Sequence, residues 1–432
     1  MPITSRRHFL AGLAGAGVAL PTFSERAVAQ IFKAETVAGS RDAAALASDE
    51  EYWSHIQRAF DTDRTMINLN NGGISPTPSH VLEQMIRDLR FTNELPVEHN
   101  WRILEPRMES TRRELAKEFG CDTEEMAVTR NASEALEIAI LGIDLARGDE
   151  VLITNQNYGR MITTWEQRVR REGIVLKQIA FPVPLTDPKL FLKTLEAAIT
   201  PRTKVIELPH ITNLTGQILP IREVMKIARP RGIEVIVDGA HAFAHFPFTR
   251  DELDCDYYGT SLHKWMHAPI GAGFLYVRKE KIAKLWPMMA AAKERDTNIR
   301  KFEEIGTHPQ ANFNAVSVAI TFHRGIGADR KIARLRYLRD RWAKALLAES
   351  PRVKVLTELG PDKAGAICMF GVEGIDPAKL GGWLLNNYKI VNTPIVHPEF
   401  NGIRITPSIY TTIDELDTFV GAVTKAIKSG VA

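Results

Sequence analysis

An aspartate and a lysine whose types and spacing suit the same chemistry lie in residues 233–265, IEVIVDGAHAFAHFPFTRDELDCDYYGTSLHKW. Asp238 ends an apolar run typical of a buried strand, and Lys264 follows Ser261 and His263. A lysine amine can form a Schiff base, and a carboxylate can hold a pyridinium nitrogen protonated so that the ring withdraws electrons. The pair therefore predicts a site for pyridoxal 5'-phosphate (PLP), with Lys264 as the catalytic lysine and Asp238 as the partner of the pyridine nitrogen.

The motifs around this pair resemble those of one enzyme family. Asp-Gly-Ala-His-Ala at 238–242 and Ser-Leu-His-Lys at 261–264 are similar to the class V aminotransferase family of PLP-dependent enzymes, in its isopenicillin-N-epimerase-like branch. The resemblance covers roughly residues 65–428 and implies the fold-type I architecture. It also implies that His241 approaches the phenolic oxygen of the cofactor and that Ser261 and His263 contact its phosphate.

The same resemblance assigns further cofactor contacts. In Thr129–Glu134, Ala132 and Ser133 resemble the turn that binds the phosphate at a helix N-terminus; an ordinary N-cap by Asn131 or Ser133 is the alternative. Tyr158 falls where the family stacks an aromatic ring on the cofactor, although a position on the rim would also suit it. Asn213, in the His-Ile-Thr-Asn-Leu-Thr-Gly turn at 210–216, would bond to the phenolic oxygen or serve only as a turn residue.

Two more residues complete the expected site. Arg404, in Gly-Ile-Arg-Ile-Thr-Pro at 402–407, matches the arginine that binds the substrate carboxylate, a task that suits the bidentate guanidinium. Thr307, after Gly306, resembles a loop that crosses a dimer interface to the neighbouring phosphate, so we expect a homodimer. His241 with His245, and His263 with His267, have the spacing of a metal pair on a helix, but the pattern supplies no third ligand. No metal site is predicted.

These residues need a scaffold that brings strand ends together. Strands and helices alternate from Met126 onward, which predicts an α/β fold: a mostly parallel sheet covered by helices on both faces. Ligands bind outside the C-terminal ends of such strands, and the candidate residues follow the predicted strands. The pattern changes after about Ala315 to a long helical region, Val316–Glu349, short strands and a closing helix, Asp414–Lys428. This indicates a smaller C-terminal α+β domain.

The N-terminus has the features of an export signal. Arg6 and Arg7 precede an apolar, glycine-containing run, and Ala27-Val28-Ala29 is a cleavage motif, which predicts a mature start near Gln30. The stretch SRRHFL resembles a twin-arginine signal, whose export machinery carries folded proteins, so we expect a periplasmic or secreted enzyme. The predicted organisation is a signal peptide at 1–29, a helical segment at 30–64, a PLP-binding domain at 65–315 and a small domain at 316–432.

Composition excludes several other classes. The 432 residues carry 55 Lys and Arg against 52 Asp and Glu, and no basic patch with interleaved aromatic residues indicates nucleic-acid binding. Outside the N-terminus no apolar run is long enough to cross a membrane, so no membrane insertion is expected after cleavage. Three cysteines without a CxxC motif exclude a disulfide framework or a cysteine-rich zinc site.

The expected reaction begins with a Schiff base between PLP and the amino group of a small amine-bearing substrate, an amino acid or peptide-like metabolite. Cysteine desulfurases of the family carry a nucleophilic cysteine before the carboxylate arginine, and residues 391–400, VNTPIVHPEF, contain none. Epimerisation or transamination is therefore expected rather than desulfuration. A PLP-dependent lyase or tailoring enzyme of an exported peptide or siderophore is one alternative. A non-catalytic binding protein with this fold is another, and a zinc hydrolase using the histidine pairs is a third.

Overall fold

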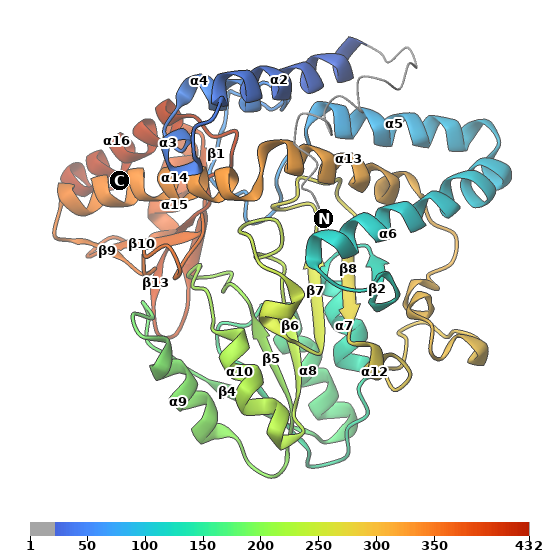
Figure 1. The fold of residues 1–432 in the computed structure, drawn as a ribbon. Helices are drawn as coiled ribbons and strands as arrows, with labels where there is room; N and C mark the ends of the chain where they lie inside the picture. Colours follow the sequence, from blue (N-terminus) through green and yellow to red (C-terminus); the bar gives the residue numbers. More distant parts are fainter. Residues whose placement is uncertain (1–21, 432) are drawn as a thin grey trace.

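A seven-stranded sheet forms the centre of the molecule (Figure 1) in a computed structural model that describes residues 22–431, with side chains from residue 29. The strand order is β2-β8-β7-β6-β5-β3-β4. Strand β8 runs antiparallel to β2 and β7, whereas β7, β6, β5, β3 and β4 pair in parallel. The predicted mostly parallel sheet is thus confirmed. Its strands span Met126–Thr129 (β2), Glu150–Thr154 (β3), Val175–Ile179 (β4), Thr203–Pro209 (β5), Glu234–Asp238 (β6), Tyr257–Ser261 (β7) and Gly273–Val277 (β8).

Both faces of this sheet are buried, and successive side chains of each strand point to opposite faces. In β6, Val235 and Val237 join one hydrophobic cluster while Ile236 joins another. Helices α7 (Ala132–Gly142) and α8 (Gly159–Glu172) cover the Ile236 face. The opposite face is covered by α6 (Glu105–Phe119), α9 (Pro188–Ala198), α10 (Ile221–Ala228) and α13 (Ala311–Ile326). The sheet is therefore the middle layer of three, as an α/β fold requires.

The N-terminal part of the described chain is helical, and its helices pack beside α13 and α14 (Figure 1). The segment 97–104, which the sequence does not predict to be helical, forms a π-helix between α5 and α6. The expected signal motif at Arg6 and Arg7 lies outside the described residues. The helices here are α2 (Thr22–Ala38), α3 (Ala43–Leu46), α4 (Glu50–Gln57), α5 (Ser79–Glu94) and the π-helix Val97–Leu104.

A second, antiparallel sheet of order β12-β13-β10-β9 lies in the C-terminal part with its own hydrophobic cluster. The helix predicted at 316–349 is broken, because Gly327 has a φ of 88° and separates α13 from α14 (Ala328–Glu349). The domain boundary expected at 315/316 falls inside α13, and the boundaries stay a prediction. The remaining elements are β9 (Val353–Val355), β10 (Cys368–Val372), α15 (Pro377–Tyr388), β11 (Ile390–Val391), β12 (Thr393–Val396), β13 (Asn401–Ile405) and α16 (Ile413–Ser429).

A two-stranded parallel ladder joins the early and late parts of the chain. Strand β1 (Ile67–Asn68) pairs with β11, and an isolated bridge connects Asn70 with Thr406. The backbone N–H of Gly72 donates to Thr406 Oγ1 at 2.9 Å. The Gly72-Gly73 loop is thereby held beside the strand that carries Arg404.

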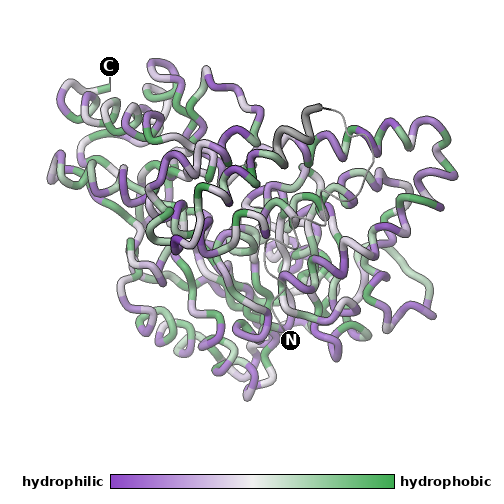
Figure 2. The backbone as a smooth tube through the Cα atoms, turned by 45° about the horizontal axis from the view of Figure 1, so that its top comes forward, coloured by the Kyte–Doolittle hydropathy of each residue, from purple (hydrophilic) through white to green (hydrophobic). Residues whose placement is uncertain are grey.

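Short helices fill the remaining connections. Two are α-helical, α11 (Arg250–Leu253) and α12 (Lys279–Ile282), and four are 3-10 turns, Thr123–Glu125, Arg229–Arg231, Lys293–Arg295 and Ile299–Glu303. Within residues 22–431 no helix is both long and apolar enough to span a bilayer. Figure 2 shows hydrophilic and hydrophobic residues alternating along the outer helices, as expected for helices that bury one side against the core.

Candidate active site

A cavity of about 600 Å³ lies at the C-terminal ends of the parallel strands. It collects residues from loops that are far apart in the sequence, as expected at this edge of an α/β sheet. All the predicted site residues except Thr307 line it. The complete lining comprises Gly72, Gly73, Asn131, Ala132, Ser133, Leu136, Tyr158, Arg160, Asn213, Asp238, Ala240, His241, Ser261, His263, Lys264 and Arg404.

Lys264 follows β7, and its Nζ lies 3.2 Å from Nε2 of His241. Burial lowers the pKa of Lys264 to about 8, although the nearby Asp238 carboxylate acts in the opposite direction and Arg404 adds to the lowering. A lysine with such a pKa is more readily neutral than a surface lysine, and a neutral amine is needed for bond formation or proton transfer. The geometry suits the predicted catalytic lysine.

Asp238 is the last residue of β6, and its side chain is buried. One carboxylate oxygen accepts a hydrogen bond from the backbone N–H of Ala240 at 2.9 Å. Burial raises the pKa of Asp238, while the Ala240 hydrogen bond and the charge of Lys264 partly offset this effect. Among the described residues that line the cavity, Asp238 is the only carboxylate. A cationic group of a ligand would therefore pair with the carboxylate of Asp238.

The predicted phosphate turn begins helix α7. Asn131 caps this helix, since its side-chain oxygen accepts a hydrogen bond from the N–H of Glu134 at 2.9 Å. The N–H of Ala132 donates to Oγ of Ser261 at 2.8 Å. Residues 131–133 and Ser261 therefore meet at one helix N-terminus, where an anion is favoured by the helix dipole and the free N–H groups.

Arg404 and Asn213 also line this cavity. Arg404 donates through Nη1 to the carbonyl of Asn213 and through Nη2 to Oδ1 of Asn70, both at 2.8 Å. The side chain is 7% exposed, and burial lowers its pKa to about 10. The two hydrogen bonds fix the plane of the guanidinium group. Tyr158 is close enough to influence the pKa of Arg404, yet it remains 43% exposed at the mouth of the cavity.

Thr307 lies elsewhere. It lines a separate cavity of about 580 Å³ together with Glu303, Gly306 and His308. Within one chain the fold does not bring Thr307 to the other candidate residues, and its expected contact with a phosphate requires a second chain. That role stays a prediction.

Several residues of the cavity are missing from the sequence-based set. Asn70 holds Arg404, Gly72 and Gly73 form part of the wall, and Arg160 stands at the mouth. The Gly-Gly pair in a loop was a usable signal, because a Cβ on Gly72 would approach Thr406 Cγ2 to 3.0 Å and His241 Cε1 to 3.5 Å. Arg160 has no comparable signal, since an arginine in the first turn of a helix looks like any surface residue.

The cavity has the donors and acceptors that PLP needs. Four buried polar atoms of its lining form no hydrogen bond with any described residue: Oδ1 of Asn213, Nδ1 of His241, Nδ1 of His263 and Nε of Arg404. Unsatisfied buried polar atoms are costly, so this cluster is suited to a polar ligand. Asn213 and His241 suit the phenolic oxygen, and the α7 N-terminus with Ser261 and His263 suits the phosphate.

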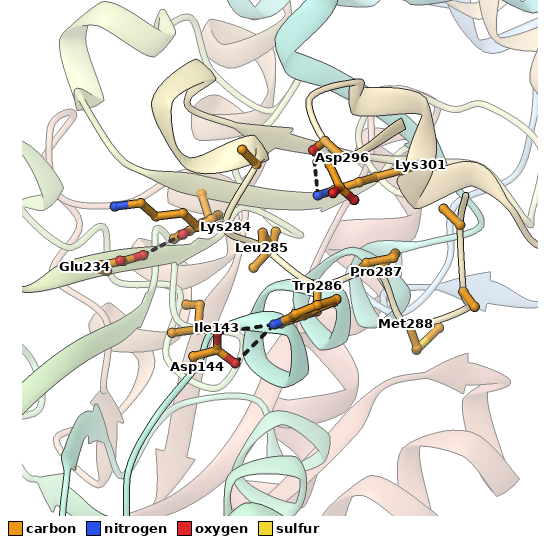
Figure 3. Close-up of a pocket in the computed structure, with 14 residues that line it drawn as sticks. Ile143, Asp144, Glu234, Lys284, Leu285, Trp286, Pro287, Met288, Asp296 and Lys301 are labelled. Carbon is orange, nitrogen blue, oxygen red and sulfur yellow. Dashed lines mark hydrogen bonds between the residues drawn. The ribbon is translucent and has the colours of Figure 1, made fainter. Parts of the chain in front are cut away.

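A second cavity, of about 630 Å³, illustrates the contrast (Figure 3). It lies by the N-terminal ends of β6 and β7, at the other edge of the sheet. The indole N–H of Trp286 donates to Asp144 at 3.1 Å, and Nζ of Lys301 donates to the Asp296 carbonyl at 2.9 Å. No side chain lining this cavity leaves a buried polar atom unpartnered among the residues described. Its groups satisfy one another, unlike those around Lys264.

Metal binding finds no support in the described part of the chain, where no group of three or more His, Cys, Asp and Glu side chains is arranged to hold an ion. His245 donates through Nδ1 to the His241 carbonyl at 2.7 Å, and its Nε2 accepts from the N–H of Ala366. Both ring nitrogens are thus occupied by backbone groups. His241 and His245 do not form a metal pair.

Comparison with known proteins finds relatives that match most of this chain. The isopenicillin N epimerase of Streptomyces clavuligerus is 29% identical over 387 residues, which cover 86% of this chain and 97% of that protein. The isopenicillin N epimerase of Amycolatopsis lactamdurans is 28% identical over 395 residues, covering 87% and 99%. A probable cysteine desulfurase of Halobacterium salinarum is 31% identical over 330 residues, covering 71% and 77%.

Solved structures share the fold. The apo cysteine desulfurase of Thermococcus onnurineus NA1 superposes with a TM-score of 0.75 at 23% identity, covering 87% of this chain and 98% of that one. A C-DES variant with glycine covalently linked to its PLP cofactor gives 0.75 at 21% identity, covering 85% and 98%. The sheet and its strand-end cavity thus define a PLP-dependent enzyme of fold type I. Residues 67–393 match the family model described as aminotransferase class-V, and the chain belongs to that family, with PLP as its cofactor.

Proposed function

We propose that this enzyme epimerises an amine-bearing carboxylate, an amino acid or a peptide-like metabolite, at the carbon that bears the amino group. The carrying observation is the position of Lys264, whose amine lies beside His241 in the cavity that Arg404 also lines. When bound, PLP supplies an electron-withdrawing ring that stabilises negative charge at the substrate Cα. The relatives named isopenicillin N epimerase match most of the chain, which supports this choice over other reactions of the family.

Each residue has a defined task in this proposal. Arg404 holds the substrate carboxylate, and its bonds to Asn213 and Asn70 keep the guanidinium oriented. Lys264 removes the Cα proton from one face and returns a proton. With a pKa near 8, about a tenth of such amines are neutral at pH 7. Asp238 keeps the cofactor nitrogen protonated. Tyr158, on the loop before α8, is the candidate proton donor for the other face.

Transamination is the closest competitor, because it uses the same lysine, aspartate and arginine. Desulfuration is disfavoured in our proposal because no described cysteine lines the cavity. Cys368 lies in β10, where burial raises the pKa of its thiol to about 12, and Cys255 is buried as well. A thiol that stays protonated is a poor nucleophile.

The test is a reaction in D₂O with purified, PLP-loaded protein and a panel of L- and D-amino acids and short peptides. An epimerase incorporates deuterium at Cα and inverts the configuration without consuming a keto acid. Oxo-acid formation with conversion of the cofactor to its amine form would identify a transaminase. Release of pyruvate or ammonia would identify a lyase, and release of sulfide from cysteine would identify a desulfurase. Lys264→Ala should abolish turnover, whereas Lys284→Ala, a lysine of the cavity in Figure 3, should not. No turnover with any substrate would refute the proposal.

We also propose that the enzyme works as a homodimer in the periplasm. The position of Thr307 outside the cavity supports a site completed by a second chain. Mixing Lys264→Ala and Thr307→Ala chains tests this, because a heterodimer regains one intact site while each parent has none. Export is tested by mass spectrometry of the periplasmic protein, with a mature N-terminus at Gln30 expected. Replacing Arg6 and Arg7 by lysine should retain the protein inside the cell.

A further inference from the structure

Among the described residues that line the cavity, Arg160 is the cation that the proposed reaction leaves unused. It is the second residue of α8, it lines the cavity, and it is exposed at the mouth. Among the described residues its guanidinium forms no ion pair and donates no hydrogen bond. Arg404, in contrast, donates hydrogen bonds to Asn213, Asn70 and Thr393. Arg160 therefore has its full set of donors available to a ligand.

Local electrostatics add to this contrast. The first turn of α8 contains no acidic residue, and its N-cap residue Tyr158 forms no side-chain cap. A positive side chain at a helix N-terminus is unfavourable unless an anion lies nearby, because the helix dipole has its positive end there. Among the described residues that line the cavity, Asp238 is the only carboxylate, and it is buried at the end of β6. In the described part of the chain, no carboxylate pairs with Arg160.

Contacts between two loops hold the segment before Arg160 against the hairpin that leads to Arg404. Asn155, before α8, donates to Oε2 of Glu399 at 2.8 Å, and its carbonyl lies 3.2 Å from Nε2 of His397. Glu399 and His397 belong to the hairpin that continues into β13 and Arg404. Tyr158, two residues before Arg160, influences the pKa of Arg404. The two guanidinium groups of Arg160 and Arg404 are therefore carried by segments that are hydrogen-bonded to each other.

Building on the proposed function, we propose that the substrate carries a second, distal carboxylate, and that Arg160 binds it while Arg404 binds the carboxylate next to the amino group. Arg160 is then a specificity-determining residue: it distinguishes dicarboxylic amines, or peptides with a free acid side chain, from neutral ones. Because the segments that carry the two cations are held together, recognition should also depend on the length of the chain between the two carboxylates.

The test uses binding, so that it does not depend on turnover. Linear dicarboxylates from succinate to suberate, which lack an amine, are titrated calorimetrically into the PLP-loaded protein, with butyrate as the monocarboxylate reference. We expect one chain length to bind best. For that length, Arg160→Ala should weaken binding fivefold to tenfold and leave butyrate unchanged, whereas Arg160→Lys should lose less. Arg170→Ala is the matched control, since Arg170 is an exposed arginine at the other end of the same helix.

The catalytic arm uses the same variants. In wild type, kcat/KM for amino acids with a terminal carboxylate should exceed that for the corresponding amides, and Arg160→Ala should remove the difference mainly through KM. An equal loss for dicarboxylates and butyrate would overturn the inference, because Arg160 would then act on the pocket in general. Faster dissociation of PLP from Arg160→Ala would also overturn it, since α7 and α8 pack together and the anion would be the cofactor phosphate. If no amine is turned over but selective dicarboxylate binding persists, the proposed reaction fails while this inference stands.

Discussion

The turn at 212–217 links the candidate site to the C-terminal sheet, and Gly216 is its most sensitive position. Gly216 has a φ of +74°, and its N–H donates to the carbonyl of Thr212 at 2.9 Å. A Cβ built on it would lie 2.2 Å from the carbonyl oxygen of Ile367 and 2.7 Å from the carbonyl carbon. Both are backbone atoms directly before β10, so they cannot rotate away as a flexible side chain can.

We predict that Gly216→Ala destabilises the enzyme by about 2–5 kcal/mol. A left-handed backbone costs about 1–2 kcal/mol for a residue with a Cβ, and relieving an overpacked contact costs about 1–3 kcal/mol more. Gly232→Ala is the matched control, because Gly232 has a φ of +67° but no atom within 4 Å of its Cβ position. It should show only the backbone cost of about 1–2 kcal/mol.

The assay is thermal and urea unfolding of both variants, followed by kinetics on the folded protein. The Asn213 carbonyl accepts from Arg404, so a displaced turn should also raise KM for the substrate carboxylate in Gly216→Ala and not in Gly232→Ala. Equal destabilisation of the two variants would refute the steric argument. A destabilised Gly216→Ala with unchanged KM would refute the link between this turn and Arg404.

Three further predictions concern buried charge. Lowering the pH from 7 to 5 should lower the unfolding temperature, and an unchanged unfolding temperature would contradict this. Burial lowers the pKa of His80 to about 4 and of His210 to about 3, so the stabilisation that each neutral ring gives is complete above the unfolded pKa near 6.5. Below that pH the stabilisation decreases, and at pH 5 each histidine has lost about 2 kcal/mol of it. Glu303→Ala should cost about 3 kcal/mol in urea unfolding, because it leaves the buried Arg112 without this ion pair; combining it with Arg112→Met should recover much of the loss. Asp238→Asn should retain PLP absorbance but reduce kcat by at least a hundredfold, about 3 kcal/mol, and a kcat near wild type would exclude the role of Asp238.

Elements with strong hydrophobic patterns could be predicted from the sequence. Asp238 ends β6 as expected, because apolar runs bounded by polar residues have few alternative structures. Strand β7 was harder to recognise, since Tyr-Tyr-Gly-Thr-Ser at 257–261 lacks an apolar run although every residue in it is buried. Gly327 breaks a helix that periodicity alone would continue.

The candidate site could be predicted only where a charged residue lies in or directly after a predicted strand. Asp238, Lys264 and Arg404 converge on one cavity, as their order along the strands suggested. Asn70 and Arg160 escaped prediction because their positions depend on how distant loops pack, which no local pattern encodes. Assignment of the roles of these residues still depends on the variants described above.

The Gly72–Thr406 hydrogen bond, which joins residues 334 positions apart, has a consequence for biosynthesis. One wall of the cavity can form only after β13 has been synthesised, because Arg404 lies on that strand. A ribosome that has released the seven-stranded sheet has therefore not yet released a complete cofactor pocket, and such long-range closure is slow to form. Productive capture of PLP and substrate therefore has to follow the synthesis of residue 404, and a nascent chain arrested before it would expose an incomplete pocket to quality control.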